Sequence, residues 1–83
     1  MNESLEIKQS IQLLKEKFLS NSVGEYKSLL EEIWNRMIIN DNKTIYVSFE
    51  NNRYISQLSK IGFNATLTMD KDKLVVQITM QEN

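Results

Sequence analysis

The stretch that decides the fold is residues 63–80, FNATLTMDKDKLVVQITM. Apolar and polar side chains alternate on both sides of the charged segment 70–73, which is typical of two strands joined by a tight turn. If Met69 faces Leu74, the remaining apolar residues also meet in pairs, namely Leu67 with Val76, Ala65 with Ile78 and Phe63 with Met80. A shift by one residue would turn this apolar set towards water, so the pattern predicts a single register.

The preceding segment predicts another strand and a short helix. Residues 43–50 alternate strictly, with Ile45, Val47 and Phe49 on one side, as in a half-buried strand. Residues 53–61 show the spacing of an amphipathic helix. Gly62 is expected to end that helix, because glycine readily adopts the positive φ found at many helix C-termini.

The N-terminal part of the chain predicts two further helices. Residues 5–20 carry a narrow apolar stripe at helical spacing, Ile7, Ile11, Leu14 and Phe18, which we expect to pack within the fold. Leu5, Leu13 and Leu19 lie off this stripe, either as solvated leucines or as a second contact. A capping box formed by Ser22 and Glu25 is expected to start the next helix.

The second helix has an unusually wide apolar surface. Its apolar residues cover about half of the circumference: Tyr26, Leu29, Leu30, Ile33, Trp34, Met37 and Ile38. We expect this helix to pack between the sheet and the first helix. The alternative is that Trp34, Met37 and Ile38 are exposed as a binding surface, since aromatic residues and Met are enriched at interfaces.

These elements predict one α+β domain over residues 1–83, with flexible ends at 1–4 and 81–83. The order is helix, helix, strand, helix, strand, strand, and the helices are expected on one face of a three-stranded sheet. Residues 50–62 are long enough for a crossover, so the first two strands are expected to run parallel, with the last strand antiparallel to a neighbour. The pattern leaves the strand order open.

Composition argues against catalysis. The chain has no histidine and no cysteine, which removes the commonest proton shuttle, the thiolate nucleophile and the usual zinc ligands. The adjacent pair Glu31 and Glu32 diverges on a helix, and Asp70 and Asp72 alternate with lysines. We therefore expect no enzyme, no catalytic residue, no metal, no cofactor and no small-molecule substrate.

The charge balance and the apolar runs narrow the class of partner. Eleven acidic and ten basic side chains leave a net charge of −1, which disfavours nucleic acid. No apolar run approaches a membrane span, and the N-terminus lacks the layout of a secretory signal, so we expect a cytoplasmic protein without membrane contact. The richness in Asn, Ile and Lys is typical of a low-GC bacterium or its phage.

The outer face of the predicted sheet is the most distinctive surface. It is expected to carry only uncharged positions, Thr44, Tyr46, Ser48, Asn64, Thr66, Thr68, Val75, Gln77 and Thr79. Such a face is either a hydrogen-bonding surface or the solvated side of an antiparallel sheet. The candidate partner-binding residues are therefore Trp34, Met37, Ile38, Tyr46, Thr66, Val75 and Gln77.

The leading hypothesis is a non-catalytic protein-binding domain, such as a phage or mobile-element inhibitor or modulator of a larger host protein. One alternative is nucleic-acid binding, in which Tyr46 stacks on a base while Lys43 or Arg53 contacts phosphate. Another alternative is a structural homo-oligomer, formed through the off-stripe leucines or through the last strand if that strand lies at a sheet edge.

Overall fold

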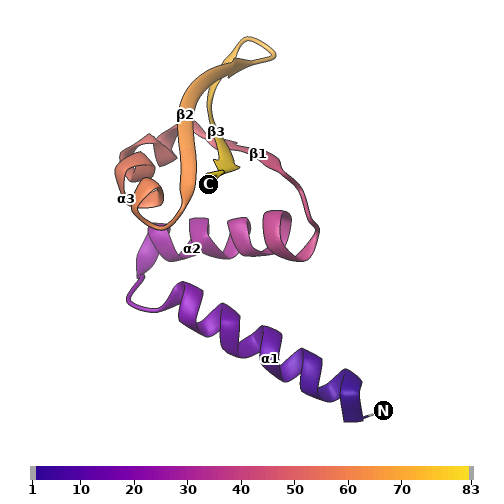
Figure 1. Ribbon diagram of the computed structural model, residues 1–83. Helices are drawn as coiled ribbons and strands as arrows, with labels where there is room; N and C mark the ends of the chain where they lie inside the picture. The colour runs from indigo at the N-terminus through magenta and orange to yellow at the C-terminus, as the bar shows by residue number, and fades with distance from the viewer. Residues whose placement is uncertain (1, 83) are drawn as a thin grey trace.

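The computed structural model describes residues 2–82, with side chains from residue 5 onwards. Figure 1 shows a small α+β domain whose helices lie on one side of a three-stranded sheet, as predicted. The elements are α1 (Asn2–Leu19), α2 (Gly24–Ile33), the π-helix η1 (Trp34–Ile39), β1 (Thr44–Ser48), the 3₁₀-helix η2 (Phe49–Tyr54), α3 (Ile55–Lys60), β2 (Phe63–Asp70) and β3 (Lys73–Met80).

The sheet is entirely antiparallel, with strand order β1-β3-β2. The predicted hairpin register is confirmed, from Met69 opposite Leu74 to Phe63 opposite Met80. Both β1 and β2 are antiparallel to β3, so they point in the same direction, as expected of the crossover, but they are not neighbours. The last strand is therefore central, and the idea that β3 pairs with another chain at a sheet edge is wrong.

The core lies between the sheet and the helix formed by α2 and η1. It is entirely apolar, and its residues are Leu29, Leu30, Ile33, Met37, Ile45, Val47, Leu58, Phe63, Ala65, Val76 and Ile78. Trp34 is also buried, with 6% of its surface exposed. Core packing of the wide apolar arc is thus confirmed for Trp34 and Met37, and neither side chain is available as the exposed binding surface considered above.

The structure differs from the sequence prediction at the start of α2 and at the end of β1. The N-cap of α2 is Val23, and the Ser22 hydroxyl donates to the Leu19 carbonyl, so the expected capping box with Glu25 does not form. β1 ends at Ser48, and Phe49 begins η2 and is half exposed, although the alternation had placed it in the strand. In both cases local hydrogen bonding replaces the simpler pattern.

The C-terminal end is held to the helix–strand junction. The Gln81 amide donates to the Gly62 carbonyl at 2.9 Å, and its side-chain nitrogen donates to the Ser59 carbonyl at 3.2 Å. Gly62 has a φ of 99°, as expected at the end of the helix. Of the ends predicted to be flexible, residues 1 and 83 and the side chains of residues 2–4 lie outside the described part.

Candidate interaction surface

Helix α1 extends away from the rest of the domain as an arm. Figure 1 shows it running from the start of α2 into open space, with the sheet on the far side of α2. The domain is accordingly elongated, with extents of 48 × 25 × 25 Å and a radius of gyration of 14.2 Å. A compact domain of this length would have a radius of gyration of about 12 Å. The excess reflects a helix that is joined to the body at one end.

The C-terminal turn of α1 provides that attachment. The Phe18 ring lies 5.6 Å from the Trp34 ring and 6.0 Å from the Phe63 ring, measured between centroids. Leu19 also packs against the core. Asn21 and Gly24 follow with positive φ values of 66° and 59°, which turn the chain into α2. The arm is therefore anchored by aromatic packing and by a tight connection.

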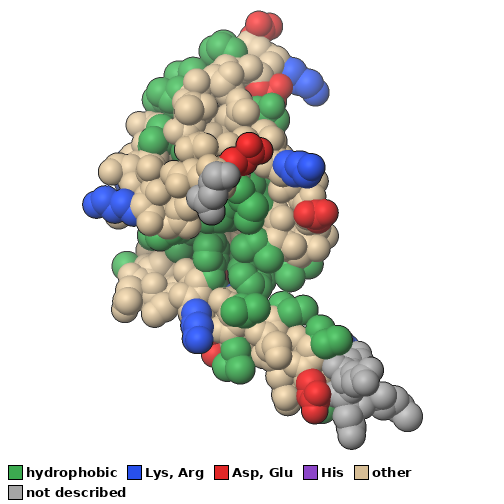
Figure 2. Space-filling view, in the orientation of Figure 1, with side chains coloured by type: hydrophobic (Ala, Val, Ile, Leu, Met, Phe, Trp, Pro, Cys, Tyr) green, Lys and Arg blue, Asp and Glu red, His purple; other side chains and the backbone are tan. Residues whose placement is uncertain are grey.

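The rest of the apolar stripe is exposed. Ile7, Ile11 and Leu14, which we call the α1 stripe, have 59%, 38% and 57% of their surface exposed. Figure 2 shows apolar side chains along this arm. The prediction that this stripe packs within the fold is correct for Phe18 and wrong for these three residues. The off-stripe residues Leu5 and Leu13 are exposed as well, whereas Leu19 packs against the core.

Lysines border one side of the α1 stripe. At 100° per residue, Lys8 and Lys15 lie about 70–90° from the centre of the stripe, on the same side and one heptad apart. The other side is mixed, with Glu6, Ser10 and Lys17. The α1 stripe thus has one basic border, which we call the lysine border.

The outer face of the sheet is open and uncharged. The registers align its side chains in three rows across β1, β3 and β2: Thr44–Thr79–Asn64, Tyr46–Gln77–Thr66 and Ser48–Val75–Thr68. Tyr46 is the aromatic residue of these rows and is 46% exposed. The nine positions carry no lysine or arginine. This face can form neutral hydrogen bonds. Lys43 lines a hollow at its Thr44–Thr79–Asn64 row, together with the acidic residues Asp41 and Glu82.

The predicted candidate residues fall into two separate groups. Tyr46, Gln77 and Thr66 share one row of the open face, and Val75 lies in the next row on β3. Trp34 and Met37 are in the core, and Ile38 is half buried beside them on η1. The structure therefore brings the four sheet residues together and separates them from the helix residues.

Of the two basic residues considered for phosphate contact, Lys43 lies at the edge of the open face, beside Asp41 and Glu82, and Arg53 lies at Glu25. Arg36 pairs with Glu32 at 2.7 Å and also donates to the Tyr46 carbonyl at 3.1 Å. Arg53 pairs with Glu25 at 2.7 Å, at the opposite end of the α2–η1 helix. Both arginines are engaged by carboxylates of the same chain.

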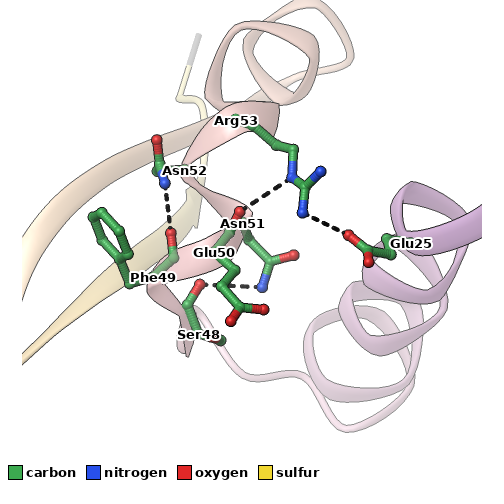
Figure 3. A network of polar contacts seen from close by, with 7 residues as sticks. All are labelled: Glu25, Ser48, Phe49, Glu50, Asn51, Asn52 and Arg53. Carbon is green, nitrogen blue, oxygen red and sulfur yellow. Dashed lines mark hydrogen bonds and ion pairs between the residues drawn. The ribbon is translucent and has the colours of Figure 1, made fainter.

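Figure 3 shows the polar network that joins η2 to α2. Besides its ion pair with Glu25, Arg53 donates from Nε to the Glu50 carbonyl at 3.4 Å. The Asn51 and Asn52 side chains donate to the carbonyls of Ser48 and Phe49. These bonds use side-chain donors to satisfy the backbone of a short 3₁₀-helix, so the network is structural.

Acidic side chains line one hollow beside α2 and η2, namely Glu25, Glu32 and Glu50, of which Glu25 and Glu32 are paired with Arg53 and Arg36. Within residues 2–82 no set of three or more acidic side chains is placed to hold a metal ion. Burial raises the pKa of Tyr26, which packs 5.1 Å from the Tyr54 ring. A higher pKa keeps this phenol neutral in the folded state, which suits packing and not acid–base chemistry at neutral pH.

Comparison with protein-family models, curated proteins and solved structures finds no match. In the part of the chain that the structure describes, no helix combines the length and the apolar content needed to cross a bilayer. The exposed surfaces of the domain are therefore the observations that point to a function. The α1 stripe is the site that sequence reasoning misassigned, although its strict four-three-four spacing already resembled the narrow seam of a helix pair.

Proposed function

We propose that this protein is a non-catalytic protein-binding domain that uses the α1 stripe to contact a helix of another protein. The observation that carries the proposal is the exposure of Ile7, Ile11 and Leu14 on an arm that the rest of the domain leaves uncovered. Most of the stability of a protein helix comes from packing of its apolar face, and α1 packs on the domain only through its last turn. A partner that covers the stripe would both bury apolar surface and stabilise the helix.

The spacing of the stripe favours a helical partner. Its residues occupy about a 60° arc, which is the width of a coiled-coil seam and narrower than the face that a core helix presents. A second helix can place its own apolar side chains between them. Complete burial of an aliphatic side chain contributes roughly 1.5–3 kcal/mol. Three partly exposed residues are thus enough for a modest, reversible contact.

The lysine border indicates the charge of that partner. Lys8 and Lys15 would face acidic residues on the border of the opposing helix, as charged residues do at the edges of coiled-coil seams. A second copy of α1 fits less well, because a two-fold antiparallel pair would place Lys8 opposite Lys15 of the other copy. A parallel pair would crowd both domains at the Phe18 end, which is already packed on Trp34.

Two designed helical peptides test the proposal. Both carry Leu and Ile at the seam, and they differ only in having Glu or Lys on the borders. We expect fluorescence anisotropy to show that the Glu peptide binds at least about tenfold more tightly than the Lys peptide. A Lys8→Glu, Lys15→Glu double variant should reverse this preference.

Adjacent leucines supply a matched control. Leu13 and Leu14 are equally exposed, at 60% and 57%, but Leu13 lies about 130° from the centre of the stripe. Leu14→Ser should abolish binding of the Glu peptide, whereas Leu13→Ser should retain it, with helicity checked by circular dichroism. Equal losses in the two variants, or no binding of either peptide, would contradict the proposal.

Within this proposal, a cytoplasmic setting and a role as inhibitor or modulator of a larger host protein remain expectations from the sequence. They depend on the identity of the partner. The nucleic-acid alternative is less favoured, because Arg53 is paired with Glu25 and Lys43 lies beside Asp41 and Glu82 at the border of the open face.

A further inference from the structure

The two edges of the sheet are protected to different degrees. β1 is short, and Arg36 donates to its Tyr46 carbonyl, so a charged side chain already occupies a backbone acceptor there. β2 is longer and forms the other edge. Natural sheets commonly guard their edges with charges, proline or bulges, because an unpaired edge accepts a strand from another chain.

β2 lacks these guards along most of its length, because its one charged residue, Asp70, is the last residue of the strand. From Phe63 to Met69 the strand contains no charged residue and no proline, and it pairs without a bulge along β3. Among residues 2–82, no hydrogen bond from outside the sheet is made to the backbone of residues 64–70. The outer row of backbone groups on this strand is thus free to pair.

The end of the hairpin adds an uncovered apolar patch beside that edge. Leu67, Met69 and Leu74, which we call the hairpin patch, have 48%, 62% and 44% of their surface exposed. They lie on the face that is buried further down the hairpin, where Ala65, Val76 and Ile78 are in the core. In Figures 1 and 2 the hairpin rises beyond the helices, and apolar side chains gather at its end.

We propose that β2 pairs with β2 of a second copy, antiparallel about a two-fold axis at Leu67, to form a continuous six-stranded sheet. This register places Leu67 opposite Leu67, Ala65 opposite Met69 and Thr66 opposite Thr68. Asp70 faces Asn64, so no like charges are opposed. Apolar residues meet on the helix side of the sheet, and threonines meet on the open side.

The same symmetry covers the hairpin patch. Rotation about Leu67 brings the end of one hairpin beside the start of the other copy's β2, where that copy's α3 packs on the strand. Ile61, at the end of α3, is 45% exposed and becomes available to this contact. The β2 edge is self-complementary, and each copy would cover the hairpin patch of the other. A second copy of the chain is therefore the partner that fits this edge best.

Charge substitution at the axis tests the proposal. We expect sedimentation of the full chain to show a dimer fraction that rises with concentration up to about 1 mM. Leu67→Lys and Leu67→Asp should each be monomeric, because like charges meet at the axis, and an equimolar mixture of the two should dimerise again. Thermal melting of each variant confirms that it folds, and Leu14→Lys, on α1, should dimerise like the wild type.

Cysteine substitution gives a second readout. The chain has no cysteine, so Leu67→Cys would place two thiols across the axis, within the separation that a disulfide needs. Met69→Cys is the matched control, because its thiol faces Ala65 and not its own copy. Mild oxidation should form the disulfide between two copies of Leu67→Cys much faster than between two copies of Met69→Cys.

Three results would overturn the proposal: a wild-type chain that stays monomeric, a Lys–Asp mixture that does not associate, or equal rates of disulfide formation in the two cysteine variants. The α1 stripe is tested separately, by comparing Leu14→Ser with Leu13→Ser in binding of the Glu peptide.

Discussion

At the scale of single residues, the hairpin turn stores conformational strain. Lys71 and Asp72 have positive φ values of 49° and 66°, as a type I′ turn requires at both central positions. The left-handed region costs most L-residues about 1–2 kcal/mol, whereas Gly and, to a lesser degree, Asn and Asp tolerate it. The strain therefore lies mainly at Lys71. The strand register pairs Asp70 with Lys73, so only Lys71 and Asp72 are left to form the turn.

Replacing these two residues with the preferred pair should therefore stabilise the protein. We expect Lys71→Asn combined with Asp72→Gly to increase the free energy of unfolding by about 1 kcal/mol, because Asn-Gly adopts the type I′ geometry with little strain. In a domain of this size that corresponds to a rise in melting temperature of about 4–8 °C. An unchanged or lower melting temperature, measured by calorimetry, would show that the native residues relieve the strain in another way.

At the scale of elements, α1 and α2 carry similar apolar content but differ in what covers it. Ile33 on α2 is completely buried, whereas Ile7 on α1 is 59% exposed. The packed end of α1 contributes to the core through Phe18 and Leu19. The exposed end contributes little to folding, so its side chains are free to serve a partner.

A pair of equivalent substitutions measures this difference. Ile33→Ala should lower the free energy of unfolding by about 2–5 kcal/mol, because it leaves a cavity in the core. Ile7→Ala should change it by less than about 0.5 kcal/mol, since alanine also favours the helix. Urea denaturation of the two variants provides the measurement. A large loss of stability from Ile7→Ala would mean that the α1 stripe is covered within the isolated chain.

At the scale of the whole molecule, the charges are balanced and locally paired. The net charge is −1, and the ion pairs Arg36–Glu32 and Arg53–Glu25 use two of the ten basic side chains. These pairs are exposed and so contribute little to stability. The nine positions of the open face carry no charge, and the nearby cations Arg36 and Lys43 lie beside the acidic residues Glu32, Asp41 and Glu82.

This distribution predicts little affinity for nucleic acid. In fluorescence anisotropy at low salt, a labelled single-stranded oligonucleotide should show no saturable binding at micromolar protein, because backbone contacts with phosphate dominate such affinity. A designed basic single-strand-binding domain serves as the positive control. Saturable binding that is lost in Tyr46→Ala would favour the nucleic-acid alternative over the protein-binding proposal.

The sequence was most informative where the physics is local. Apolar and polar side chains alternate along residues 63–80. Only one strand register places all of the apolar ones on the same face, so each residue pair of the hairpin could be predicted. The wide apolar arc on α2 similarly predicted a central helix, and Trp34 is buried accordingly. The absence of histidine and cysteine limits the accessible chemistry whatever the fold.

Tertiary structure alone decided which apolar residues remain uncovered. A periodic stripe specifies that a face is apolar, but not whether this chain or another covers it. Ile7, Ile11 and Leu14 have the pattern of a core face, yet the turn after Leu19 directs α1 away from the body. Leu67 and Met69 alternate like Phe63 and Ala65, yet the helix layer ends before it reaches them. Strand order was also undetermined, because backbone pairing between distant segments depends on how the connections pack and not on any one strand's sequence.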